Sequence, residues 1–132
     1  MNLKGLFLAA IAMAAFAAPA PAHHSFAMFD QQKTVEIQGT VTEFEWIAPH
    51  AWIRLNVPDA QGKMLPWAIE MSPPVIAAGN GWKADSLKPG DKVVLQIHPM
   101  RDGSRSGQLL EATLPDGTGI TRTRNTRVPA TP

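Results

Sequence analysis

The sequence has 132 residues, no cysteine, and a formal net charge of +1 from 12 basic and 11 acidic residues. A chain of this length is suited to one domain with a modest core. The lack of cysteine excludes disulfides, thiol catalysis and cysteine-ligated zinc. The near-neutral net charge, together with the export argued below, disfavours nucleic acid as a partner.

Residues 1–22 have the pattern of a cleavable signal peptide. Lys4 is their only charged residue, and it precedes an apolar stretch, Leu6 to Ala18, that is too short to span a bilayer as a helix. The alternative is an uncleaved membrane anchor, which the short apolar stretch and the cleavage site that follows it disfavour.

The cleavage site determines which residue begins the mature chain. Ala20 and Ala22 supply the small residues that signal peptidase requires. Cleavage after Ala20 would leave Pro21 first, where proline is unfavourable, so we expect cleavage after Ala22. The mature protein then begins at His23, is formally neutral, and lies in the periplasm or outside the cell with no stable membrane anchor.

Alternating apolar residues predict five strands, with a bulge in the first near Thr42 to Glu43. Gly39, in the middle of the first strand, indicates a bend or the close approach of another backbone. A short helix with Ser72 as its N-cap is expected around residues 75–78. The strands are expected at residues 35–46, 52–57, 65–69, 93–98 and 108–114.

Five short strands with one helix between the third and fourth predict an all-β, five-stranded OB-like barrel. The alternative is an open β-sandwich, because alternation alone does not determine closure. We expect the domain to comprise residues 23–120. Residues 121–132 lack apolar periodicity and are expected to form a disordered tail.

Four histidines remain after the expected cleavage: His23, His24, His50 and His98. A terminal His23 could chelate one ion through its free amine and its own Nδ1, and His24 could add a further nitrogen. Tetragonal nitrogen sites of this kind suit Cu(II). Because His50 and His98 lie at predicted strand ends, a barrel could bring either one to the same rim as a third ligand.

This metal hypothesis has a plain alternative. The terminal histidines could be solvent-exposed, while His50 and His98 simply form hydrogen bonds with loop backbone. No compact zinc-type ligand spacing is present. We therefore hypothesise a periplasmic binding protein for copper or a similar divalent metal, with oligomeric state and metal identity left open.

A metal-free binding module is the second hypothesis. Trp52 shares its strand face with Arg54 and could help to bind a small molecule, an envelope glycan or a protein partner. Glu43, Glu45 and Glu70 are interpreted as solvated positions on strand faces. No hydrolase or nucleotide-binding motif occurs, so enzyme activity is not expected.

An ordered series of short motifs covers nearly the whole mature chain. The motifs are His23-His24-Ser25-Phe26, Gly39-Thr40-Val41, Phe44-Glu45-Trp46, Pro49-His50-Ala51, Trp67 to Glu70, Gly81-Trp82, Leu87 to Asp91, His98-Pro99 and Asp102-Gly103. This series resembles an uncharacterised bacterial family of small exported proteins, a domain of unknown function. The resemblance implies an exported OB-like β domain and supplies no catalytic residues.

Overall fold

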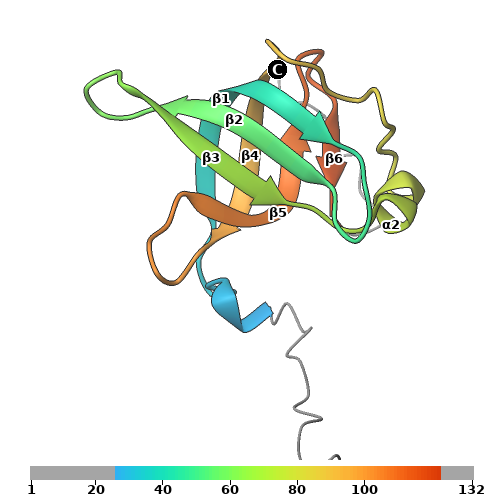
Figure 1. Cartoon of the computed structure of the whole chain (residues 1–132), viewed down its shortest axis with the longest axis horizontal. Coiled ribbons are helices and arrows are strands. Elements are labelled where there is room, and N and C mark those ends of the chain that lie inside the picture. Colours follow the sequence, from blue (N-terminus) through green and yellow to red (C-terminus); the bar gives the residue numbers. More distant parts are fainter. Residues whose placement is uncertain (1–25, 123–132) are drawn as a thin grey trace, which may run out of the picture.

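A computed structural model describes residues 26–122 and shows an all-β domain with one short α-helix (Figure 1). The predicted signal peptide (residues 1–22), His23 and His24 lie outside the described residues, as do residues 123–132 of the expected tail. Of that tail, residue Thr121 ends β6. In chain order the elements are η1 (Phe26–Met28), β1 (Val35–Glu45), β2 (Trp52–Pro58), β3 (Met64–Glu70), α2 (Pro74–Gly79), β4 (Lys92–Pro99), β5 (Ser106–Thr113) and β6 (Gly119–Thr121).

Five strands close into the predicted barrel. The sheet order is β3-β2-β1-β4-β5-β6, and a short parallel pairing of β3 with β5 joins its two sides. This confirms the five-stranded barrel with one helix between β3 and β4. The structure adds β6, a short sixth strand outside the barrel that pairs with the second half of β5.

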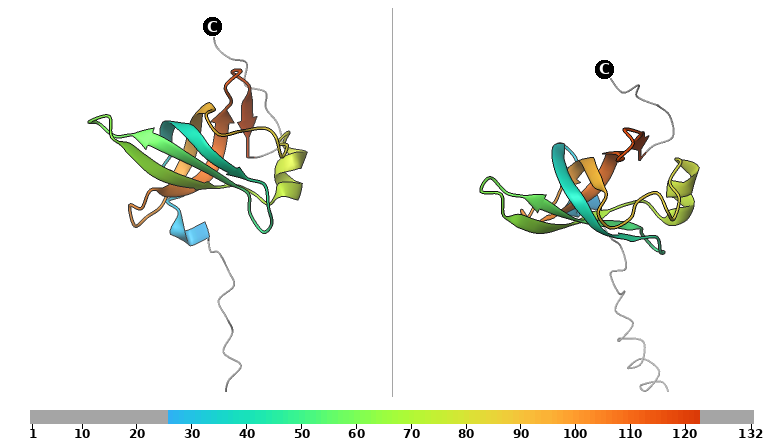
Figure 2. Two further views of the ribbon diagram at one scale, coloured as in Figure 1. Left: turned by 45° about the horizontal axis from the view of Figure 1, so that its top comes forward. Right: turned by 90° about the horizontal axis from the view of Figure 1, so that it is seen from above.

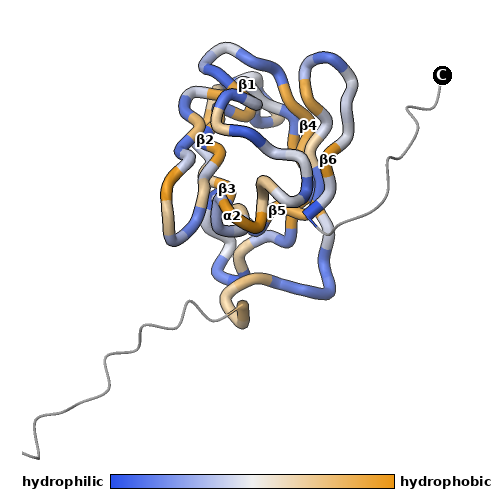
Figure 3. Tube along the Cα trace, turned by 90° about the vertical axis from the view of Figure 1, so that its right-hand side faces the viewer, coloured by the Kyte–Doolittle hydropathy of each residue, from blue (hydrophilic) through white to orange (hydrophobic). Residues whose placement is uncertain are grey.

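The core fills the barrel with the apolar residues that the alternation predicts. Ile53, Ile69, Leu95 and Ile97 are completely buried, and Figure 3 shows polar and apolar residues alternating along the strands. Burial of such side chains is worth about 1.5–3 kcal/mol each relative to exposure, so with no cysteine the domain depends on this core.

The first strand bends where the sequence predicts. The pairing of β1 with β2 shifts register between Val41 and Glu43, which confirms the bulge. A Cβ added to Gly39 would lie 2.6 Å from the carbonyl oxygen of Asn56 and 2.9 Å from Cδ1 of Leu55. The glycine therefore permits the close approach of β2.

The helix α2 includes the predicted residues 75–78 and begins at Pro74, one residue later than an N-cap at Ser72 would place its start. Its N-cap is Pro73, with no side-chain cap, so the prediction of Ser72 as N-cap is wrong. The reason is that Pro73 itself precedes a proline, which disfavours helical backbone at that position. Figure 2 shows α2 at one end of the barrel and η1 outside it. None of the helices within residues 26–122 is long and apolar enough to cross a membrane.

Candidate functional site

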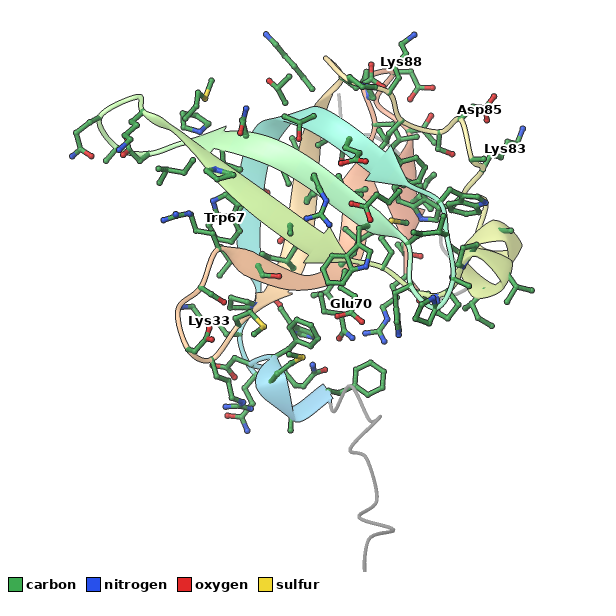
Figure 4. The ribbon with its side chains drawn as sticks, in the orientation of Figure 1. Lys33, Trp67, Glu70, Lys83, Asp85 and Lys88 are labelled. Carbon is green, nitrogen blue, oxygen red and sulfur yellow. The ribbon has the colours of Figure 1, made fainter. Side chains whose placement is uncertain are left out.

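A buried carboxylate lies at the C-terminal end of β3. Glu70 is only 6% exposed, although its strand position places it on the outer face of the barrel, opposite Trp52 on one side and Gln108 on the other. The interpretation of Glu70 as a solvated strand position is therefore wrong, whereas Glu43 is exposed as expected. Figure 4 shows Glu70 at the edge of the barrel that lies nearest the N-terminal turn.

Two segments outside the barrel lie near the row formed by Trp52, Glu70 and Gln108. Gln108 is 4% exposed, and the side-chain amide of Gln31, which follows η1, donates a hydrogen bond of 3.3 Å to its Oε1. The end of β6 brings Arg122 near Glu70. The segments that carry Gln31 and Arg122 thus lie beside the outward-facing side chains of Glu70 and Gln108, and these side chains form a partly enclosed site.

His50 is held by two acceptors at one ring nitrogen. Its Nδ1 lies 3.0 Å from the carbonyl oxygen of Met71 and 3.2 Å from Oε1 of Glu70. A carbonyl oxygen can only accept a hydrogen bond, so Nδ1 carries the proton and donates it. The neutral ring therefore has its basic lone pair on Nε2.

The topology explains why Glu70 and Arg122 meet. Glu70 pairs with Gln108 of β5, and the backbone N–H of Arg122 donates a 2.6 Å hydrogen bond to Leu110 of the same strand. Because β3 runs parallel and β6 antiparallel to β5, their C-terminal ends point toward each other along one edge of β5. Strand β4 occupies the opposite edge.

Arg122 also contacts the N-terminal turn. Its Cζ atom lies 5.3 Å from the ring centroid of Phe26, a cation–π distance. Partial burial lowers the pKa of Arg122, and the negative charge of Glu70 acts in the opposite direction. The start of the described chain is thus linked through Arg122 to the surroundings of Glu70 and His50.

His98 is held in a similar way at a different place. Its Nδ1 lies 2.8 Å from the carbonyl oxygen of Lys33, so Nδ1 again donates and the lone pair of the neutral ring is on Nε2. His98 pairs with Gln108 from the β4 side. Along the cross-strand row that contains His98, Gln108, Glu70 and Trp52, strands β5 and β3 lie between His98 and β2, which follows His50.

The structure does not bring His50 and His98 into one ligand set. Within residues 26–122 it contains no group of three or more histidine, aspartate or glutamate side chains that could hold a metal ion. The proposed terminal ligands His23 and His24 fall outside that range. The described part of the chain supplies two oriented imidazoles at separate places, and each could add one ligand.

Trp52 and Arg54 lie on one face of β2, as predicted. Trp52 is half-buried. Nε of Arg54 donates a hydrogen bond to Glu45 and lies 3.7 Å from Oε2 of Glu43. The guanidinium is thus paired with two carboxylates of the neighbouring strand, which reduces its capacity to bind an anionic ligand.

Two open clefts lie away from these residues. One, of about 620 Å³, includes Gly39, Met64 and Lys92 in its lining. The other, of about 640 Å³, lies beside Arg122 and Ile76. Neither is lined by His50, His98, Trp52 or Arg54, so these clefts do not coincide with the predicted site residues that lie within 26–122.

The sequence gives no signal for the role of Arg122, which falls in the segment that lacks apolar periodicity.

Searches of curated proteins and of solved structures return no significant match. Residues 10–110 match the sequence model of a family of unknown function. The chain therefore belongs to the family of unknown function DUF6152, in agreement with the resemblance noted from its motifs.

Proposed function

We propose that the mature protein is a periplasmic binding protein for Cu(II) or a similar divalent metal. In this proposal the signal peptide is removed after Ala22, and His23 binds the ion through its amine and Nδ1. His24 adds a nitrogen, and one internal histidine, His50 or His98, completes a tetragonal set of the kind that suits Cu(II).

The orientation of the internal histidines carries this proposal. Each donates its Nδ1 proton to a backbone carbonyl, at 3.0 Å for His50 and 2.8 Å for His98. Metal-binding histidines commonly donate one ring N–H to a carbonyl or carboxylate, which orients the other nitrogen toward the ion. His50 has both kinds of acceptor, since Glu70 lies 3.2 Å from the same nitrogen.

The terminal amine adds a ligand that an internal histidine lacks. An α-amino group has a reference pKa of about 8, so near neutral pH a metal displaces a readily lost proton. The site should therefore bind copper most tightly when His23 is the first residue.

The test is a comparison of two purified proteins by calorimetry and electron paramagnetic resonance. Tag-free protein beginning at His23 should bind one Cu(II) with a nitrogen-rich tetragonal spectrum. The matched control carries one alanine before His23, which replaces the free amine by an amide, and it should bind more weakly. Absence of Cu(II) binding by the first protein would overturn the proposal, and equal affinity of the two would remove the amine from it.

The metal-free binding module has less support. It depends on the face that carries Trp52 and Arg54, and Arg54 is already paired with Glu43 and Glu45. We therefore favour the metal over a ligand that would bind to this face.

A further inference from the structure

One open cleft on the outside of the barrel carries two side chains of opposite charge. It has a volume of about 640 Å³ and is lined by residues that include Ile76 of α2, Glu111 of β5 and Arg122, which follows β6. Clefts that bind small organic molecules have volumes of about 300–1,000 Å³. Neither internal histidine of the proposed copper site lines this cleft, so it is a separate candidate site.

A bulge in β5 forms one wall of the cleft. The pairing of β4 with β5 shifts register between Gln96 and Ile97. Gln96 opposes Glu111, but the next pair skips Leu110. Consecutive side chains of a regular strand point to opposite faces, whereas Leu110 and Glu111 both line the cleft. The bulge thus places an apolar side chain and a carboxylate next to each other on the outside of the barrel.

Arg122 supplies the positive charge of the cleft. Its backbone N–H donates a 2.6 Å hydrogen bond to the carbonyl oxygen of Leu110, and its own carbonyl oxygen accepts one from the side chain of Asn80. These bonds fix the residue between the bulge and the end of α2. Among residues 26–122, no carboxylate forms an ion pair with its guanidinium. Glu70 attracts this charge from nearby but does not line the cleft.

Glu111 supplies the negative charge. Its partner on β6 is Thr121, the residue before Arg122, so the backbone positions of Glu111 and Arg122 are about 6–7 Å apart. Within the described part of the chain, its carboxylate forms no ion pair with a lysine, arginine or histidine. The two charges therefore lie close together without neutralising each other, which favours a ligand that carries both a carboxylate and an ammonium group.

The remaining walls of the cleft are partly apolar. Ile76 is 54% exposed although it is a large apolar side chain, and Leu110 lines the same cleft. A ligand that covers these two side chains removes apolar surface from water, which is favourable. The cleft thus combines an apolar surface with a charged pair.

We propose that this cleft binds a small zwitterion with an apolar side chain, the chemistry of an apolar amino acid. The ligand's carboxylate pairs with the guanidinium of Arg122, a geometry that allows two parallel hydrogen bonds. Its ammonium group pairs with Glu111, and its side chain covers Ile76 and Leu110. The inference does not depend on metal binding.

Calorimetry with four probes tests which parts of the ligand are recognised. Copper-free mature protein should bind L-leucine at least about tenfold more tightly than 4-methylpentanoate, which lacks the ammonium group, or 3-methylbutylamine, which lacks the carboxylate. Glycine, which lacks the side chain, should also bind at least about tenfold more weakly. Absence of leucine binding, or equal binding of leucine and 4-methylpentanoate, would overturn the proposal.

Two substitutions assign the charges of the ligand to the two side chains. Glu111→Gln should weaken leucine binding at least about tenfold and leave 4-methylpentanoate binding unchanged, whereas Arg122→Gln should weaken both. The matched controls Glu43→Gln and Arg105→Gln make the same charge changes outside the cleft and should bind leucine like the wild type. The result for Glu111→Gln does not depend on whether Arg122→Gln folds, and unchanged leucine affinity in Glu111→Gln would contradict the site.

Amide NMR spectra locate the bound leucine in the unaltered protein. The signals of Ile76, Leu110 and Glu111 should shift on titration. Those of Lys92 and Val94, which line the other open cleft, should not. Shifts confined to Lys92 and Val94 would place the ligand in that cleft and overturn the assignment.

Discussion

At the scale of single residues, Glu70 is the side chain that distinguishes this domain from a plain barrel. A buried carboxylate is costly unless charges or hydrogen bonds compensate it. Here the N–H of His50 and the nearby charge of Arg122 do so. The same contacts hold His50 in one tautomer, so the stability of the carboxylate and the orientation of the imidazole are linked.

If His50 is the internal ligand of the proposed copper site, Glu70→Gln should weaken Cu(II) binding about 10- to 100-fold, the usual effect of removing a partner that orients a metal-binding histidine. The cause would be a less defined tautomer of His50, which ¹⁵N chemical shifts of its ring report directly in copper-free protein. The matched control is Glu45→Gln, since Glu45 pairs with Trp52 in the same row but bonds to Arg54. Weaker binding with an unchanged tautomer would contradict this role for Glu70.

At the scale of elements, the path of β1 depends on one glycine. Gly39 pairs with Val93 of β4, and the backbone of β2 occupies the space where its Cβ would lie. Gly39→Ala should lower the free energy of unfolding in urea by about 2–3 kcal/mol, because backbone must shift to accept the methyl group. Gly119→Ala is the control, since its Cβ would meet only Oε1 of Glu111 at 3.5 Å. If Gly39→Ala and Gly119→Ala unfold at the same urea midpoint, β1 can move away from β2 at little cost in free energy.

The elements also show what could be predicted from the sequence. Period-2 alternation identifies β1 to β5, and Gly39 in mid-strand signals the close approach of a backbone, because both are local properties of the chain. Strand β6 has only three residues, Gly119–Thr121, too few for a periodic signal. The burial of Glu70 depends on Arg122 and on the convergence of β3 with β6, which are long-range consequences of topology.

At the scale of the whole molecule, the proposed copper site would couple metal binding to folding only through its internal histidine, His50 or His98. The amine and imidazoles of His23 and His24 are adjacent in sequence, so they can bind Cu(II) in the unfolded chain nearly as well as in the folded one. A ligand that binds both states equally does not stabilise the fold. The increase in stability of the fold on copper binding therefore measures the contribution of the ligand that only the folded domain supplies.

Saturating Cu(II) should accordingly raise the melting temperature of the mature protein. If the internal histidine strengthens binding tenfold in the folded state, the gain is about 1.4 kcal/mol, which corresponds to about 5–10 °C for a domain of this size. One of the two variants His50→Gln and His98→Gln should abolish the shift while calorimetry still detects binding by the terminal histidines, and the other should leave the shift intact. A shift that survives both substitutions would assign the folded-state ligand to another residue, because a site confined to the terminus cannot distinguish the folded chain from the unfolded one.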